Sequence, residues 1–309
     1  MKLSIIAPCK NEEGNVKKLY SKIKDCLKDI KYEIIFINDG SEDKTLEYLK
    51  ELYEEDMVHV KILSFSRNFK KEAAMLAGLE HASGEYTCII DSDLQQNPGY
   101  LLDMLNFLDK NKEYDEVAMV MQKRNSDSKL MALCKNIFYK LMDSITDVHF
   151  EKSASDFRMF RVNVKETIIS LQESNRFSKG IFAWVGYKVK YMPYIVEPRT
   201  SGKSEFGFIA STKYALDGIF AFSTQPLKIA YTCSILTYIS FLIYLVVMFI
   251  FSLYNGTSAI ILVMLFMFAT LFLLVGILGS YLARIYCETQ NRPKYVIKEK
   301  FGFTDKNIL

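Results

Sequence analysis

The sequence lacks a large charge excess, paired cysteines and a recognisable signal-peptide pattern, and each absence argues against a class of protein. Lysine and arginine number 39 against 36 aspartates and glutamates, so the net charge of +3 gives no case for nucleic-acid binding. The six cysteines form no C-x-x-C pair and no zinc-finger spacing, which predicts free thiols in a reducing compartment. The apolar run Leu3 to Pro8 is short and is followed at once by charged residues, unlike a signal peptide. We therefore expect the amino-terminal part to stay in the cytoplasm.

Charged side chains are absent altogether between Lys228 and Arg284. A polar turn at Tyr254–Ser258 divides this stretch into two helices of roughly 24 residues, each about 36 Å long and able to cross a hydrocarbon core of about 30 Å. The sequence therefore predicts two transmembrane helices within 228–284. Because the turn is uncharged and the tail, 285–309, is basic, the positive-inside tendency places both ends in the cytoplasm.

The segment 201–227, just before this stretch, interleaves aromatic and aliphatic side chains with Lys203, Lys213 and Asp217. Such a segment can lie in the membrane interface with its lysines toward lipid phosphates. A helix packed against a protein core explains the same pattern, so both interpretations stay open.

Residues 1–200 are expected to form a cytosolic domain in which strands alternate with helices. This alternation is typical of βαβ units and a mostly parallel sheet, so we expect an α/β fold. The predicted strands are residues 3–8, 32–38, 60–65, 86–90 and 115–121, and the predicted helices are roughly 11–28, 43–55, 71–81 and 129–143, with another beginning near Pro98.

Polar residues follow four of the predicted strands, at 8–12, 38–41, 66–71 and 91–95. In parallel sheets, ligands bind outside the carboxyl ends of the strands. We therefore expect these four loops to share one edge of the sheet and to form a binding site there.

The loop after the fourth strand carries the most specific signal, because Asp91 and Asp93 are spaced i, i+2. In an extended chain this spacing puts both carboxylates on one side, and Gln95 continues the row. Three oxygen ligands of this kind suit Mg²⁺ or Mn²⁺, with a substrate diphosphate completing the shell. Asp, Asn and Pro are also ordinary turn residues, so a helix-capping turn is the alternative for the motif alone.

Single basic residues in the second half are candidates for binding a second, lipid-borne phosphate, since guanidinium and ammonium groups suit phosphate oxygens. These are Arg124, Arg158, Arg199 and Lys203. Arg199 and Lys203 lie shortly before the expected interfacial segment, at the depth of an anionic headgroup.

A set of motifs resembles the family 2 polyprenyl-phosphate glycosyltransferases, the relatives of dolichol-phosphate mannose synthase that have two carboxyl-terminal transmembrane helices. The motifs occur in family order over about residues 3–284. They are Pro8-x-x-Asn11-Glu12-Glu13, Asn38-Asp39-Gly40-Ser41, Ser66-Arg67-Asn68-Phe69-x-Lys71-Glu72, Asp91-x-Asp93-Leu94-Gln95, Asp156-Phe157-Arg158, Asn175-Arg176-Phe177-x-Lys179-Gly180 and Ala215-Leu216-Asp217-Gly218-Ile219.

The resemblance implies a GT-A fold, a UDP- or GDP-sugar donor, a divalent ion, and transfer with inversion to a polyprenyl phosphate, undecaprenyl phosphate in bacteria. It implies the following site residues, by motif position. Pro8, Glu12, Asp39, Lys71 and Asp91 would bind the nucleotide. Asp91, Asp93 and Gln95 would hold the metal and diphosphate, and Asp93, Asp156 and Arg158 would be catalytic.

Asp156 is not expected to act as a general base. A phosphate monoester has a second pKa of about 6 and is largely ionised at neutral pH without help. We expect Asp156 to position Arg158 or the acceptor instead. The sequence departs from the family pattern at three places. Lys10 stands where the family commonly has an aromatic residue, Lys70 replaces a frequent glycine, and Val120–Lys123 stands where a Tyr-Gly pair is usual. These departures put in doubt base stacking and the shape of the sugar pocket.

Two other functions are alternatives. A processive polysaccharide synthase usually has a Q-x-x-R-W motif and more spans, whereas this chain has Gln172–Phe177 and two expected spans. A non-catalytic membrane scaffold would not need Asp39, Asp91 and Asp93. UDP-glucose and UDP-N-acetylglucosamine are the candidate donors. Further partners left open are a flippase, a downstream transferase that uses the lipid-linked sugar, and a second copy of the chain.

Overall fold

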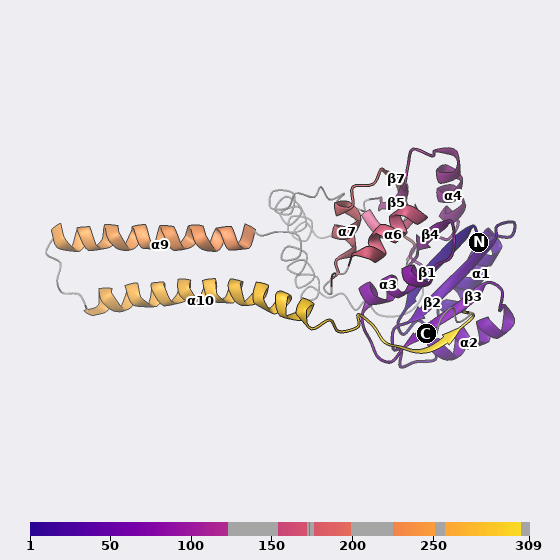
Figure 1. Ribbon diagram of the computed structural model, residues 1–309, viewed down its shortest axis with the longest axis horizontal. Coiled ribbons are helices and arrows are strands. Elements are labelled where there is room, and N and C mark those ends of the chain that lie inside the picture. The colour runs from indigo at the N-terminus through magenta and orange to yellow at the C-terminus, as the bar shows by residue number, and fades with distance from the viewer. Residues whose placement is uncertain (123–153, 172, 174–175, 199–224, 251–256, 304–309) are drawn as a thin grey trace.

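The computed structural model describes residues 1–122, 154–171, 173, 176–198, 225–250 and 257–303. These residues form one eight-stranded sheet in the order β7-β5-β6-β4-β1-β2-β3-β8, and two long helices that extend away from it (Figure 1). The predicted helix at 129–143 and most of the segment 201–227 lie outside the described residues.

The amino-terminal half of the sheet follows the predicted alternation. Strands β1 (Leu3–Cys9), β2 (Tyr32–Asn38), β3 (Val60–Phe65) and β4 (Tyr86–Ile89) are parallel to one another, and they are connected by helices α1 (Val16–Cys26), α2 (Thr45–Glu55) and α3 (Lys71–His81). Every residue of β2 is buried, as expected for a strand covered on both faces. The predicted mostly parallel α/β sheet is therefore confirmed.

Two hydrophobic cores lie on opposite faces of the sheet. One contains Leu19 and Ile23 of α1, Leu49 of α2, and residues of α4 (Tyr100–Lys110). The other contains α3 together with α6 (Val162–Ser170) and α7 (Ser178–Trp184). Gly78 allows α3 to lie close to the sheet, because a Cβ there would be 2.3 Å from Ile6 Cγ2.

The second half of the sheet is mixed. Strand β6 (Ala154–Arg161) runs antiparallel to β4 and to β5 (Glu116–Met121), and β7 (Val189–Tyr194) runs parallel to β5. Because β6 lies beside β4 in the opposite direction, its first residues reach the edge where β4 ends. The polar loops after the parallel strands therefore meet the start of β6.

The last strand, β8 (Ile297–Phe301), was not anticipated from the sequence. It comes from the basic tail after the membrane segment and pairs antiparallel with β3, at the opposite end of the sheet from β7. Lys50 Nζ lies 2.6 Å from Glu299 Oε2, and the ring of Tyr295 stacks on Phe65. The tail is thus part of the sheet domain, and it covers an edge that would otherwise expose unpaired backbone groups.

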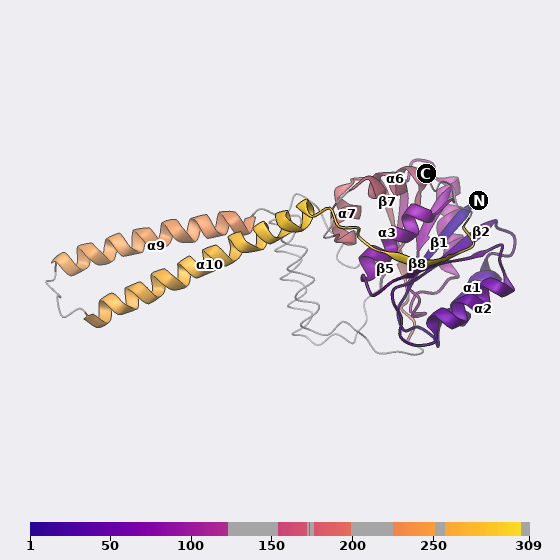
Figure 2. The same ribbon diagram turned by 60° about the horizontal axis from the view of Figure 1, so that its bottom comes forward.

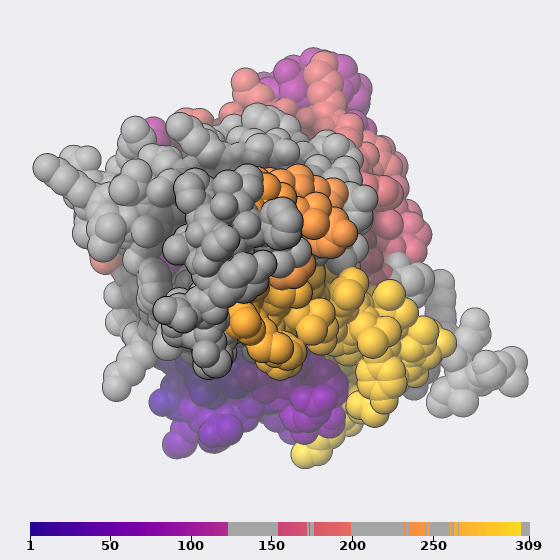
Figure 3. Space-filling view, turned by 90° about the vertical axis from the view of Figure 1, so that its left-hand side faces the viewer, coloured from indigo at the N-terminus to yellow at the C-terminus, as the bar shows by residue number. Residues whose placement is uncertain are grey.

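Helices α9 (Gln225–Ile250) and α10 (Thr257–Thr289) form an antiparallel pair that projects from the sheet domain (Figure 2). Seen from the far end of the pair, the two helices lie side by side in front of the domain (Figure 3). Among the described residues, one stretch is long and apolar enough to cross a membrane, Phe266–Thr289, and a shorter apolar stretch is Ile235–Tyr244. One candidate span is therefore found, and the predicted pair of spans is not confirmed.

Candidate active site

The loops after β1 and β2 contact each other at the carboxyl edge of the sheet. Asn11 donates its N–H to Ser41 Oγ at 3.0 Å, and Asn11 Oδ1 accepts from Glu42 N at 2.9 Å. Glu12 donates its N–H to Thr45 Oγ1 at 2.8 Å. Since Asn11 has a φ of 53° and these residues are used in loop contacts, α1 begins at Val16 and not at Asn11 as predicted.

Asp39 connects the loops after β2 and β3. Its carboxylate is buried, and Oδ1 accepts from Phe69 N at 2.6 Å. The next residue, Gly40, has a φ of 63°, and a Cβ there would be 2.6 Å from the backbone of Arg67 and Asn68. The close packing of these loops therefore requires glycine at position 40.

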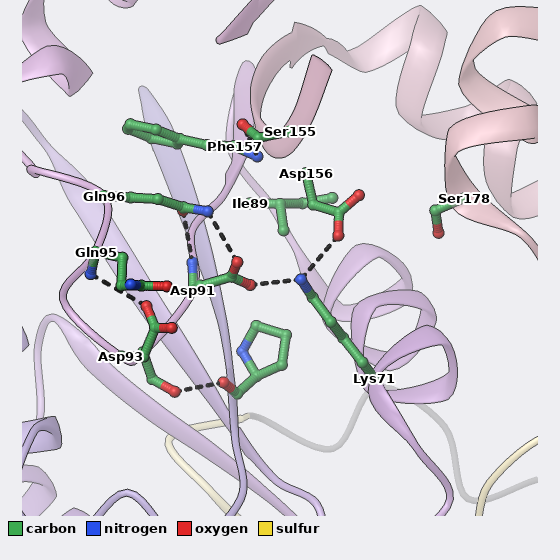
Figure 4. Close-up of polar contacts among 12 residues, drawn as sticks. Lys71, Ile89, Asp91, Asp93, Gln95, Gln96, Ser155, Asp156, Phe157 and Ser178 are labelled. Carbon is green, nitrogen blue, oxygen red and sulfur yellow. Dashed lines mark hydrogen bonds and ion pairs between the residues drawn. The ribbon is translucent and has the colours of Figure 1, made fainter. Parts of the chain in front are cut away.

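The centre of the site is an ion-pair cluster in which Lys71 bridges two carboxylates (Figure 4). Lys71 Nζ lies 2.6 Å from Asp91 Oδ1 and 2.8 Å from Asp156 Oδ2. The three side chains come from the first turn of α3, the residues after β4, and the third residue of β6. The site residues Lys71, Asp91 and Asp156 are thus brought together from distant parts of the sequence.

The chain after β4 turns, and this corrects the expectation of an extended row. Leu94 has a φ of 62°, and Asp93 Oδ1 accepts from Gln95 N at 3.1 Å. Gln96, which the sequence analysis did not single out, holds Asp91 twice (Figure 4). Its Oε1 accepts from Asp91 N at 2.8 Å and its Nε2 donates to Asp91 Oδ2 at 2.8 Å. Local turn formation therefore replaces the alternation that would have aligned the three side chains.

The same turn is attached to β1. Ser92 Oγ donates to the carbonyl oxygen of Pro8 at 2.8 Å, so the predicted nucleotide residue Pro8 lies next to the acidic turn. Gln95 accepts from Glu197 N through its backbone oxygen at 3.0 Å. These contacts fix the position of the acidic turn at the edge of the sheet.

The electrostatics of the cluster are dominated by burial and by Lys71. Burial would raise the pKa of Asp156, but the ammonium of Lys71, with help from Lys179, outweighs it and holds that pKa well below its usual range. Burial raises the pKa of Asp91, and the neighbouring carboxylates add to the rise while Lys71 opposes it. Although burial disfavours a charged lysine, the two carboxylates raise the pKa of Lys71. We therefore treat Lys71 as protonated and Asp156 as ionised at neutral pH.

Arg158 makes its contacts with Glu116 and Phe182. Its guanidinium is buried, donates to Glu116 Oε1 at 2.6 Å, and stacks over the ring of Phe182 at 3.9 Å. Among the described residues, Asp156 accepts its side-chain hydrogen bond from Lys71 and not from Arg158. The expected pairing of Asp156 with Arg158 is therefore replaced by one with Lys71, because Glu116 of β5 holds the guanidinium of Arg158 while Lys71 of α3 reaches the carboxylate of Asp156.

Three further residues near the cluster, Glu72, Ser178 and Lys179, were not predicted as site residues. Glu72 accepts hydrogen bonds from the N–H and the hydroxyl of Ser178, which joins the start of α3 to the start of α7. Lys179 follows, and burial lowers its pKa while Asp156 raises it. The motif Asn175–Gly180 was the available signal for Ser178 and Lys179.

The described part of the site fits a divalent metal only in combination with a ligand. No group of three or more His, Cys, Asp or Glu side chains converges as a preformed metal site among the described residues. Asp91 and Asp156 nevertheless place two carboxylates around one lysine, with Asp93 two residues from Asp91, and Asp156 Oδ1 is buried without a hydrogen-bond partner in this part of the chain. Hard oxygen donors with excess negative charge suit Mg²⁺ or Mn²⁺ when a diphosphate supplies the remaining ligands.

The predicted phosphate-binding residues Arg124, Arg199 and Lys203 lie outside the described residues.

Comparison with known proteins identifies the type of domain. Residues 4–169 match the family model of glycosyl transferase family 2. The chain is 37% identical to the SfII prophage-derived bactoprenol glucosyl transferase of Shigella flexneri over 97% of this chain and 98% of that protein. It is 34% identical to the prophage bactoprenol glucosyl transferase homolog of Escherichia coli over 96% of this chain and 99% of that one.

The fold has a solved counterpart. Glucosyl-3-phosphoglycerate synthase from Mycobacterium tuberculosis, in complex with Mn²⁺, UDP-glucose and phosphoglyceric acid, has a TM-score of 0.50 and 16% sequence identity over 71% of this chain and 78% of that chain. At this level of identity the similarity concerns the fold alone.

Proposed function

Because the chain belongs to glycosyl transferase family 2, with a GT-A-like fold and a mostly parallel sheet, we propose that it transfers a hexose from a nucleotide sugar to a polyprenyl phosphate. The donor we propose is UDP-glucose, with UDP-N-acetylglucosamine as the second candidate, and the acceptor is undecaprenyl phosphate. The product is an undecaprenyl-monophosphate sugar.

The observation that carries this proposal is the full-length similarity to proteins named bactoprenol glucosyl transferases, bactoprenol being undecaprenol. The match includes the apolar carboxyl-terminal segment as well as the sheet domain. A soluble donor site at the edge of the sheet, next to a membrane-associated segment, suits a reaction between a water-soluble nucleotide sugar and a lipid.

The donor is proposed to bind over the loops that follow β1, β2 and β4. Asp39 and Glu12 face the nucleoside, Pro8 lies beside the acidic turn through its contact with Ser92, and Lys71 meets the diphosphate. This assignment rests on the motif positions and on the contacts that join these loops.

Asp91, Asp93 and Gln95 are the proposed residues for Mg²⁺ or Mn²⁺, with Gln96 orienting Asp91. When bound, the ion would neutralise charge on the leaving diphosphate. The protein's own contribution is to hold the two carboxylates in the turn and to balance their charge with Lys71.

The acceptor phosphate is proposed to attack the anomeric carbon directly. One phosphate oxygen forms a bond to that carbon while the bond from the carbon to the diphosphate oxygen breaks, and UDP leaves with the electron pair. A single displacement of this kind inverts the anomeric configuration. Asp156 would orient Lys71 at the reacting groups, and Arg124, Arg199 and Lys203 are the proposed contacts of the lipid phosphate. The buried pair with Glu116 suits Arg158 to a supporting position beneath the site.

The reaction is proposed to take place at the cytoplasmic face of the membrane, with both termini in the cytoplasm and two spans formed by α9 and α10. The charge distribution around residues 228–284 supports this orientation.

The function can be tested with membranes that contain the protein. We expect a labelled UDP-sugar and undecaprenyl phosphate to give a lipid product whose mass identifies the sugar, and EDTA to abolish it until Mg²⁺ or Mn²⁺ is restored. A scaffold protein gives no product with any donor, and a processive synthase gives a polymer instead of a single added hexose. Either result would contradict the proposal.

A further inference from the structure

Lys71 occupies a position that a divalent metal would need at Asp91. Its ammonium group lies 2.6 Å from Asp91 Oδ1, and Gln96 takes the other carboxylate oxygen, Oδ2, at 2.8 Å (Figure 4). Both oxygens of Asp91 are therefore engaged by protein donors. The side chain of Lys71 is 36% exposed and that of Asp91 30%, so solutes can reach this pair.

The second partner of Lys71 provides a place for the ammonium when Asp91 is given up. Asp156 Oδ2 holds Nζ at 2.8 Å, while Asp156 Oδ1 is buried without a partner among the described residues. A small movement of the flexible lysine toward Asp156 would free Asp91 Oδ1 and keep the ammonium paired. The donor's diphosphate would offer the ammonium further negative charge at the same edge of the sheet.

We propose that Lys71 is an internal counter-cation that competes with the divalent metal for Asp91, so that the metal binds tightly only when the nucleotide diphosphate draws Lys71 away. This inference rests on the metal site of the proposed function. It explains why Lys71 neutralises part of the negative charge of Asp91 and Asp156 when no donor is bound. Metal and nucleotide then bind cooperatively, because each favours the arrangement in which Lys71 has left Asp91.

The competition has a definite sign. A positive charge 2.6 Å from the metal-binding oxygen repels a dication and blocks one lone pair, so removing it should strengthen metal binding. A lysine that instead helped to build the metal site would give the opposite result. The test is therefore direct metal binding by the full chain in detergent, measured by electron paramagnetic resonance of free Mn²⁺, with and without UDP.

We expect Lys71→Met to bind Mn²⁺ at least about fivefold more tightly than the unchanged chain in the absence of UDP, within the usual range of coupling between sites. UDP should strengthen Mn²⁺ binding in the unchanged chain by a larger factor than in Lys71→Met, because the variant has no competitor to remove. Lys70→Met is the matched control, since it removes the same charge from the neighbouring exposed residue and should leave both factors unchanged.

Lys71→Gln is the second variant, because its neutral amide can still donate to Asp156 if Lys71→Met does not fold. An increase in melting temperature on adding Mn²⁺ provides a second measure, and it should be larger for either variant than for the unchanged chain. Equal or weaker Mn²⁺ binding by the variants overturns the inference, as does the absence of Mn²⁺ binding in every variant. Formation of the lipid product is assayed separately. If the unchanged chain forms no product but Lys71→Met binds Mn²⁺ more tightly, the result contradicts the proposed function and leaves this inference intact.

Discussion

At the scale of single residues, the most informative side chain is Asp156, because its surroundings decide between a base and a positioning residue. Lys71 lies 2.8 Å from Asp156 Oδ2, and its charge outweighs burial to keep the pKa of Asp156 well below the usual range. A carboxylate with such a low pKa is a poor proton acceptor near neutral pH. The geometry therefore favours positioning of Lys71 over base catalysis.

We expect Asp156→Asn to lower kcat roughly 10- to 100-fold, because a misplaced Lys71 disturbs the alignment of the reacting groups. The loss should be about the same at every pH from 6 to 9, since the phosphate acceptor is ionised through most of this range. The check is a pH profile of lipid product formation. Full recovery of the variant at high pH would return Asp156 to the role of base.

Lys70 has backbone angles that suit glycine. Its φ is 74° and its ψ is 163°, a region that costs a residue with a side chain on the order of 1–3 kcal/mol. We expect Lys70→Gly to raise the free energy of unfolding by about 1 kcal/mol after the greater entropy of unfolded glycine is subtracted. Thermal unfolding of the full chain in detergent measures this.

The matched control is Lys44→Gly, which makes the same change just before α2, where φ is an ordinary −77°. Lys44→Gly should lower the free energy of unfolding slightly or leave it unchanged. A loss of stability in Lys70→Gly equal to that in Lys44→Gly would show that position 70 is not strained.

At the scale of elements, a buried carboxylate ties three parallel strands and the loop before β4 together. Glu33 of β2 accepts from Ser4 Oγ of β1 at 2.5 Å and from Ser83 N at 2.8 Å, and it pairs with Lys61 Nζ of β3 at 2.5 Å. Its side chain is fully buried. Burial alone would raise the pKa of Glu33, but Lys61 and the two serines outweigh it, so the pKa lies below its usual value.

We expect Glu33→Gln to cost about 3 kcal/mol, because it leaves Lys61 without its partner and replaces a pure acceptor by a group that also donates. That corresponds to a drop in melting temperature of about 6–12 °C. Since the folded-state pKa is depressed, ionised Glu33 stabilises the protein at neutral pH, and this contribution is lost as the pH falls below about 4. The difference between the two proteins should therefore shrink in acid.

The control is Glu85→Gln, at an exposed carboxylate that pairs with Lys2 at 3.5 Å. Its effect should stay within about 0.5 kcal/mol, as is usual for surface ion pairs. A difference between Glu33→Gln and the unchanged chain that stays constant down to pH 3 would contradict the linkage argument.

At the scale of the whole molecule, the sheet domain and the membrane segment are joined twice. The chain enters α9 after the sheet domain and returns from α10 into β8, which pairs with β3. The polypeptide on both sides of α9 and α10 therefore belongs to one body. This arrangement agrees with the proposal that both ends of the helical pair are on the same side of the membrane.

We expect a cysteine introduced at Ser258 to react with a membrane-impermeant thiol reagent in intact cells, because it lies next to the uncharged turn on the proposed outer side. The unchanged chain should react only after the cells are permeabilised, through exposed Cys287 near the end of α10. Labelling of the unchanged chain in intact cells, or protection of the Ser258→Cys variant, would contradict the proposed orientation.

Small residues in α10, Gly276, Gly279 and Ser280, are the type that lets membrane helices pack closely, within one chain or between copies. In the part of the chain that the structure describes, a Cβ at Gly276 or Gly279 would meet no atom within 4 Å apart from the helix's own neighbouring backbone. Ser280 donates its hydroxyl to the carbonyl oxygen of Gly276 at 2.9 Å, which is a contact within the helix. Among the described residues, Gly276 and Gly279 therefore do not pack against another part of the chain.

The sequence by itself determined the elements whose signal is local. The strands Tyr32–Asn38 and Val60–Phe65 and the helix Lys71–His81 have the predicted bounds, because apolar runs, helical periodicity and turn residues lie within each segment. Asp39, Asp91 and Asp156 were also predicted from the sequence as site residues, since the motifs that carry them resemble those of a known family, and these roles stay predictions.

Only the tertiary structure decided which of these side chains meet. Lys71 and Asp156 are 85 residues apart, and Arg158 and Glu116 are 42 apart. Their pairing depends on β6 lying antiparallel beside β4, and the strand β8 depends on a chain that returns from the helical pair. Such contacts depend on the order of strands in the sheet, and no spacing within the sequence encodes that order directly.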